Sequence, residues 1–144
     1  MNRSSVYKEI SISTSSPTNL VVLLYQGSVR FLREAVDDIR RHDYVHKRQC
    51  IDQAAAIIHY LQSTLDTEKS QDLARELKRL YDYITVRIYE GSTRLDCQPI
   101  EEVIKLLETL LSGWEQIALI KEKNAVSTEI LTEQASGERF EIQA

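Results

Sequence analysis

Apolar residues recur at alternating steps of three and four along four segments of the chain, and this spacing predicts amphipathic helices. The predicted segments are about 16–41, 44–65, 70–91 and 99–123. Ser16-Pro17 is a favourable helix start, whereas Gly91 is a favourable helix end. The predicted links are short, and short links make neighbouring helices antiparallel. The pattern therefore predicts an all-α protein, an antiparallel up-down four-helix bundle over residues 16–123.

The two ends of the chain lack this pattern. Residues 1–15 are polar and rich in Ser and Thr, with Val6, Tyr7, Ile10 and Ile12 spaced through them, which predicts an N-terminal docking arm. Residues 124–144 lose the helical periodicity and are polar. We expect them to form a disordered C-terminal tail.

The segment LVVLLYQGSVRFL, residues 20–32, is more apolar than a helix with one buried face requires. The stripe that packs on a core is already supplied by Leu20, Leu24, Phe31, Ala35 and Ile39. Five further apolar residues are left over: Val21, Val22, Leu23, Tyr25 and Val29. Either two sides of this helix are buried within the protein, or a partner covers one of them.

Composition narrows the class of protein further. A chain of 144 residues can bury one substantial core, so a single domain is expected. The net charge of -4 does not attract the negatively charged phosphate backbone, which argues against nucleic acid as a partner. No apolar run is long enough to insert into a membrane, and the N-terminus lacks the apolar core of a signal peptide. Two widely spaced cysteines fit reduced thiols, so a cytoplasmic location is expected.

The sequence contains few residue patterns that are typical of catalytic or metal-binding sites. The inward-facing Glu-x-x-His pairs of di-iron bundles are absent from the sequence. His42, His46 and Cys50 are spaced four residues apart and could share one helical face. Solvated histidines beside a small buried thiol explain the same pattern better, so we expect no metal and no cofactor.

Adjacent acidic pairs do not converge on a substrate either. Asp37-Asp38 and Glu101-Glu102 are neighbours in predicted helices, where successive side chains point about 100° apart, so they are interpreted as surface charges. Nucleophile motifs and glycine-rich phosphate loops are also absent. The sequence predicts a protein that is not an enzyme.

Tyrosine is unusually common, with seven Tyr against two Phe. Tyrosine combines a large apolar ring with a polar tip, which suits half-buried grooves that another chain covers. For any single tyrosine, packing beside the core is the better explanation, as for Tyr81 and Tyr89 on the third predicted helix. The excess as a whole favours an interaction surface.

Three segments together resemble the flagellin-specific export chaperone family, FliS. They are LVVLLYQGSVRFLREA, LKRLYDYITVRIYEG and IEEVIKLLETLLSGW, and they are preceded by SVYKEI and SSP in the order typical of that family. The similarity covers about residues 5–122 and leaves out the C-terminal tail. Gln26 departs from the family, in which an acidic residue is usual, and Ser28 replaces a common Ala.

The resemblance implies a helical bundle that binds the C-terminal segment of newly made flagellin in the cytoplasm. It also implies that the bundle keeps flagellin unpolymerised and helps to deliver it to a component of the flagellar export gate, without a nucleotide. The matching motifs assign the partner-binding residues Tyr7, Ile10, Leu24, Tyr25, Phe31, Tyr81 and Tyr83. Two other classes stay open, namely a generic helical adaptor that dimerises through its apolar surface and a metal-binding bundle.

Overall fold

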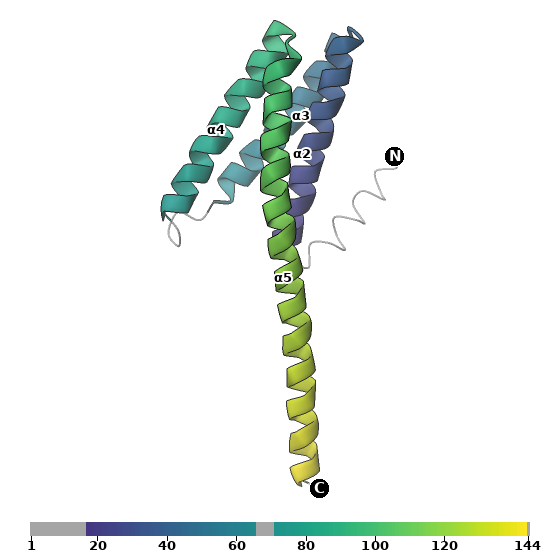
Figure 1. Cartoon of the computed structure of the whole chain (residues 1–144), viewed down its shortest axis with the longest axis vertical. Helices are drawn as coiled ribbons and strands as arrows, with labels where there is room; N and C mark the ends of the chain where they lie inside the picture. Colours follow the sequence, from purple (N-terminus) through teal and green to yellow (C-terminus); the bar gives the residue numbers. More distant parts are fainter. Residues whose placement is uncertain (1–16, 66–70, 144) are drawn as a thin grey trace.

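The computed structural model describes residues 17–65 and 71–143, with side chains as far as residue 127. Four helices make up this part of the chain: α2 (Pro17–Arg40), α3 (Tyr44–Ser63), α4 (Gln71–Arg94) and α5 (Cys97–Gln143). Among the described residues there is no strand. The all-α four-helix bundle predicted from the sequence is confirmed (Figure 1).

The helices are arranged in a ring of neighbours. Helix α2 packs against α3 and α5, and α4 packs against the same two helices, so that α2 and α4 lie diagonally opposite each other. Neighbours run antiparallel, as the short connections require (Figure 1). Helix α4 leans away from α5 towards its own N-terminal end, so the bundle is tighter at one end than at the other (Figure 1).

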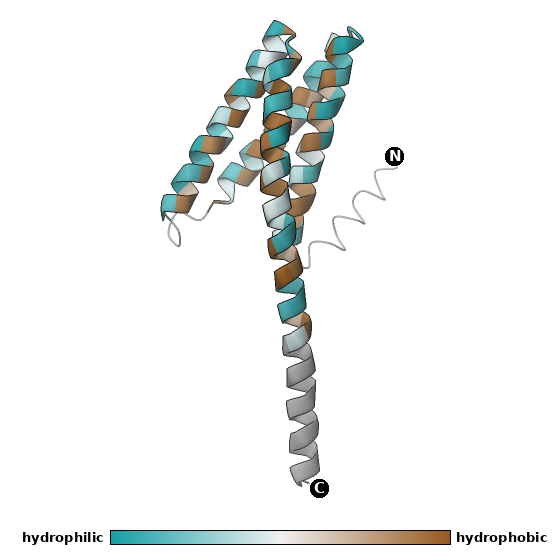
Figure 2. Cartoon of the chain, in the orientation of Figure 1, coloured by the Kyte–Doolittle hydropathy of each residue, from teal (hydrophilic) through white to brown (hydrophobic). Residues whose placement is uncertain are grey.

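The core follows the predicted apolar stripes and contains residues from all four helices (Figure 2). Leu32 on α2, Ile58 on α3, Ile84 on α4 and Leu107 on α5 are completely buried. The stripe predicted for the third helix is buried only in part, because Leu73 in its first turn is 61% exposed. The apolar contacts are therefore concentrated in the tight half of the bundle.

Residues with left-handed backbone conformation end two of the helices. His42 has a φ of 60° after α2, and the Asp43 carboxylate then caps α3 by accepting a hydrogen bond from the His46 amide at 3.2 Å. Leu95 has a φ of 54° after α4. Helix α4 does not end at Gly91, as its sequence predicted, but continues to Arg94. Gly91 is needed inside the helix for packing, since a Cβ there would lie 2.8 Å from both the Asp96 carbonyl oxygen and Ile100 Cγ1.

Helix α5 is much longer than the predicted fourth helix. It continues past Lys123 to Gln143 and projects beyond the bundle, whereas the sequence predicted a disordered tail from residue 124 (Figure 1). Residues 121–127 are all exposed, so this stretch is helical without an apolar face buried against the bundle. Glu, Ala, Gln and Leu favour helix intrinsically, which a search for apolar periodicity overlooks. The predicted arm of residues 1–15, with Tyr7 and Ile10, lies outside the described residues.

Candidate partner-binding surface

Helix α4 exposes several large apolar side chains along its length. Its exposed large residues are Leu73, Tyr83, Val86 and Tyr89, with exposed fractions between 41% and 61%. The face opposite Tyr83, Val86 and Tyr89 contributes Ile84 and Ile88 to the core, and Leu73 lies on that core face in the exposed first turn. A solvated apolar helix face of this kind, flanked by polar groups, is typical of a surface that another protein covers.

A surface hollow of about 690 Å³ lies between α4 and α5, and we call it the α4–α5 hollow. It is lined by Leu80, Tyr83, Gln98, Glu101, Glu102, Lys105, Leu106 and Thr109. The Tyr83 hydroxyl donates to Glu102 Oε1, and Arg87 donates to Glu102 Oε2 at 2.6 Å. These two donors lower the pKa of Glu102, while the carboxylate raises the pKa of Tyr83. The hollow therefore combines the apolar side chains of Leu80 and Leu106 with a Glu102 carboxylate that is held by Tyr83 and Arg87.

A second hollow of about 650 Å³, the α3–α4 hollow, lies on the other side of α4. Its apolar wall comes from Ala55, Ala56 and Val86, and Tyr89 stands at its edge. The Tyr89 hydroxyl donates to Asp52 Oδ1 at 2.9 Å, which ties α4 to α3. The two hollows place a tyrosine on each flank of α4.

The first turns of α2 form a third, half-buried apolar region. Residues 20–24 are neither fully buried nor fully exposed, and Thr18 accepts a hydrogen bond from Lys121 Nζ on α5 at 2.9 Å. Phe31 is also half-buried, with the Arg30 guanidinium 5.5 Å from its ring centroid. Leu24 and Phe31 both pack against the core and keep part of their surface in solvent.

Tyr25 and Tyr81, both expected at the partner surface, lie in the core instead. Their exposed fractions are 0% and 2%, and their hydroxyl oxygens are 2.5 Å apart in a hydrogen bond between α2 and α4. The ring of Trp114 packs against Tyr25 with 6.4 Å between centroids. Burial raises the pKa of both tyrosines, since water no longer solvates the phenolate form. Neither side chain offers surface to a partner in this conformation.

The family model described as "Flagellar protein FliS" matches residues 1–121. The flagellar secretion chaperone FliSB of Pseudomonas aeruginosa is 36% identical over 110 residues, which are 76% of this chain and 87% of the relative. The flagellar secretion chaperone FliS of Salmonella typhimurium is 34% identical over 111 residues, which are 76% of this chain and 82% of the relative.

The chain belongs to the FliS family. A further relative, the flagellar secretion chaperone FliS of Bacillus subtilis, is 27% identical over 115 residues, which are 80% of this chain and 85% of the relative. The FliS match ends at residue 121, so the outer part of α5 lies beyond it. No helix among the described residues has the length and apolar character required to cross a membrane.

Sequence reasoning about this FliS chain located only part of the surface. Of the residues assigned from the family motifs, Tyr83 lies in the α4–α5 hollow, and Leu24 and Phe31 are half-buried on α2. Leu80 and Leu106, which line the same hollow as Tyr83, were not singled out. Leu106 is the neighbour of Leu107, which is completely buried. Two adjacent leucines in a helix point in different directions, and this was the sign in the sequence that a second side of α5 is apolar.

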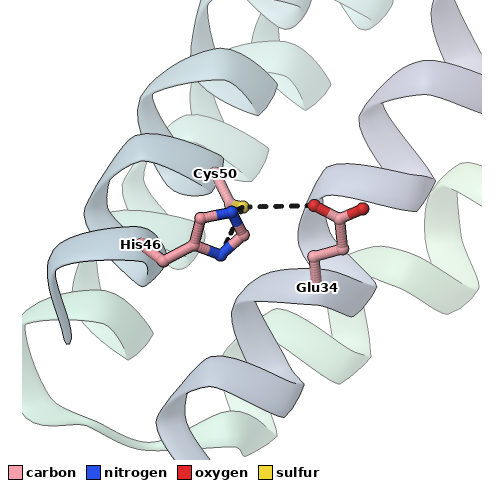
Figure 3. Close-up of side chains that lie close together, drawn as sticks. All are labelled: Glu34, His46 and Cys50. Atoms are coloured by element: carbon pink, nitrogen blue, oxygen red, sulfur yellow. Dashed lines mark hydrogen bonds between the residues drawn. The ribbon is translucent and has the colours of Figure 1, made fainter. Parts of the chain in front are cut away.

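A separate polar cluster lies between α2 and α3, and its residues line neither hollow (Figure 3). The Cys50 thiol donates to Glu34 Oε2 at 3.4 Å, and the imidazole of His46 lies beside the sulfur. Asp38, interpreted from the sequence as a surface charge, is 2% exposed and accepts from His46 Nδ1 at 2.6 Å. That bond raises the pKa of His46, and burial together with Glu34 raises the pKa of Cys50 to about 12. His42 is not part of the cluster, since its Nδ1 bonds the Tyr44 hydroxyl at 2.6 Å.

Proposed function

We propose that this chain is a flagellar secretion chaperone that binds the C-terminal segment of flagellin in the cytoplasm. In this proposal the bound chain cannot polymerise and is handed to a component of the flagellar export gate. The observation that carries the proposal is the match to the FliS family over residues 1–121, with relatives named flagellar secretion chaperones at 34% and 36% identity.

The surface around α4 is the proposed contact for flagellin. An amphipathic helix binds a bundle by laying its apolar anchors into grooves between helices, and the α4–α5 and α3–α4 hollows provide two such grooves. Tyr83 is the proposed central contact, because it is 46% exposed and its ring stands beside Leu80 and Leu106. Leu24 and Phe31 are proposed to extend the contact along α2.

The proposed mechanism is occlusion and needs no chemical step. A flagellin segment that folds on the chaperone loses conformational entropy, so the contact must be long to reach a useful affinity. Two hollows on opposite flanks of α4 support a partner that wraps around this helix. Tyr7 and Ile10 are proposed to bind or to cover the same surface from the N-terminal arm. Tyr25 and Tyr81 are proposed to act only indirectly, by holding α4 against α2.

Titration calorimetry of the full chain with a peptide of the flagellin C-terminal segment tests the proposal. Tyr83→Ala is expected to weaken binding about thirtyfold, the loss that truncation of an interface hot spot causes. Tyr60→Ala is the matched control, because Tyr60 is 48% exposed but lines neither hollow. Its expected change in affinity is within about twofold.

Two results would contradict the proposal at different levels. Equal affinities of the Tyr83→Ala and Tyr60→Ala variants would remove the α4–α5 hollow from the contact while leaving the chaperone function in place. The absence of any calorimetric binding, with self-association seen by light scattering, would instead favour a helical adaptor that dimerises through its apolar surface.

A further inference from the structure

Two pairs of metal-ligand side chains face each other across α2 and α3, and the members of each pair are four residues apart. Glu34 and Asp38 lie on α2, and His46 and Cys50 lie on α3. Residues four apart in a helix project from the same face, so both helices direct their pair towards the shared interface. We propose that Glu34, His46 and Cys50 bind one zinc ion, with Asp38 as the residue that positions the histidine.

The distances between the proposed ligand atoms fit a tetrahedral ion. The Cys50 sulfur is 3.4 Å from Glu34 Oε2 and lies 3.7 Å and 3.9 Å from the two ring nitrogens of His46. One ligand atom from each residue lies within 4.8 Å of the other two. Bonds of about 2.3 Å to sulfur and 2.1 Å to nitrogen or oxygen place tetrahedral ligands roughly 3.6 Å apart. A turn of the His46 ring together with small movements of Glu34 and Cys50 would bring the ligand atoms to these distances.

Asp38 supplies the support that a metal-binding histidine needs. Its carboxylate is 2% exposed and holds His46 Nδ1 at 2.6 Å, which leaves Nε2 as the nitrogen for the ion. A carboxylate behind the imidazole fixes the tautomer and strengthens the ligand. The His46 side chain is 47% exposed, so its ring can turn to aim Nε2 at the ion while Nδ1 stays on Asp38. This buried carboxylate on α2 could not be found from the histidine and cysteine spacing alone.

The chemistry of the three ligands selects zinc among common divalent ions. Thiolate, imidazole and carboxylate are its usual protein ligands, whereas magnesium and calcium prefer oxygen alone. On binding, the Cys50 thiol gives its proton to the buffer and the sulfur bonds the ion in its place. A tetrahedral zinc ion would keep a fourth position for water. The ion would join α2 to α3 without contacting either hollow of α4.

Titration of the full chain with zinc chloride under reducing conditions tests the site. One ion per chain is expected, and cobalt chloride should give the near-ultraviolet band of cobalt–thiolate charge transfer. Cys50→Ser should abolish that band, and both Cys50→Ser and Glu34→Gln should weaken zinc binding at least about tenfold. Cys97→Ser and His42→Gln are the controls, since Cys97 contacts the Val36 carbonyl at 3.8 Å and His42 contacts Tyr44. Both controls should bind zinc like the unaltered chain.

The proposal also requires that zinc raise the melting temperature of the unaltered chain and leave that of Cys50→Ser unchanged. Loss of zinc binding in His42→Gln, with binding retained in Glu34→Gln, would overturn the assignment and place the ion at the helix end. An absent cobalt–thiolate band, or no saturable zinc binding, would overturn the site itself. Glu34→Gln keeps the test decisive if Cys50→Ser does not fold, because Glu34 lies at the edge of the core and makes only one described contact to the cluster.

Discussion

Helices α2 and α4 are each 24 residues long and pack against the same two neighbours. They differ in the number of residues that they bury and in the apolar side chains that they expose. Helix α2 has nine buried residues and no large apolar side chain among the exposed ones. Helix α4 has six buried residues and exposes Leu73, Tyr83, Val86 and Tyr89. Of these two diagonal helices, the one with the more apolar sequence therefore supplies more of the core, and the other exposes large apolar side chains.

This difference resolves the two interpretations that the apolar segment 20–32 left open. Around Tyr25 and Val29 two sides of α2 are buried inside the bundle, so no partner is needed to cover them. Residues 20–24 and Phe31 stay half-buried. High apolar content measures how many neighbours a helix has and does not say whether those neighbours belong to the same chain. The exposed aromatic residues of α4 are the better guide to a partner.

The largest expected effect comes from truncating one apolar residue on each helix. Leu32→Ala on α2 should lower the free energy of unfolding by about 2 to 5 kcal/mol, because Leu32 is completely buried and its loss leaves a cavity. Val86→Ala on α4 should change it by no more than about 0.5 kcal/mol, because Val86 is 56% exposed. Urea denaturation measures both, and similar losses in the two variants would break the comparison.

Replacing the glycine of each helix by alanine should change the stability of the protein in opposite directions. Gly91→Ala on α4 should cost about 1 to 3 kcal/mol of stability, since the new Cβ would meet the Asp96 carbonyl and Ile100 at 2.8 Å. Gly27→Ala on α2 should be neutral or stabilise by up to about 1 kcal/mol, because alanine favours helix and its Cβ would meet only Ile57 Cδ1 at 3.4 Å. The assignment is supported if the denaturation midpoint of Gly91→Ala is lower than that of the unaltered chain and the midpoint of Gly27→Ala is equal or higher.

Sequence reasoning predicted what depends on local pattern. The number of helices and the break between the predicted segments 16–41 and 44–65 follow from periodicity and capping. It did not predict features that depend on a second helix. Gly91 lies inside α4 because Asp96 and Ile100 leave no room for a Cβ at this position. Asp38 is buried where His46 of α3 bonds its carboxylate.

The candidate surface shows the same limit. Periodicity gives the angle of a residue around its helix but not the tilt of the helix, and the tilt of α4 decides which of its residues are exposed (Figure 1). Leu73 and Ile84 share one face of α4 by helical spacing, yet Leu73 is 61% exposed and Ile84 is completely buried. Tyr81 and Tyr83, which the family motif marks together, project about 200° apart, and Tyr81 is buried while Tyr83 lines the α4–α5 hollow.

The smallest expected effect concerns the hydrogen bond that joins α2 to α4. Tyr81→Phe removes the hydroxyl that meets Tyr25 at 2.5 Å and should cost about 1 kcal/mol at neutral pH, the net value of one such bond. Burial raises the pKa of Tyr81, whereas in the unfolded chain a tyrosine ionises near pH 10. Below that pH both states keep the phenol proton, so stability does not depend on it.

Above about pH 10 the unfolded chain releases the Tyr81 proton and the folded chain retains it, so stability falls as the pH rises towards the folded pKa. The phenylalanine variant lacks this loss, and its deficit relative to the unaltered chain should shrink by up to about 1.4 kcal/mol for each further pH unit. Urea denaturation at about pH 7 and about pH 11 measures the two deficits. Val86→Ala is the control, because its effect should not depend on pH. A Tyr81→Phe deficit that stays constant across this range would mean that water reaches the phenol, and that α2 and α4 are not held together by a buried bond.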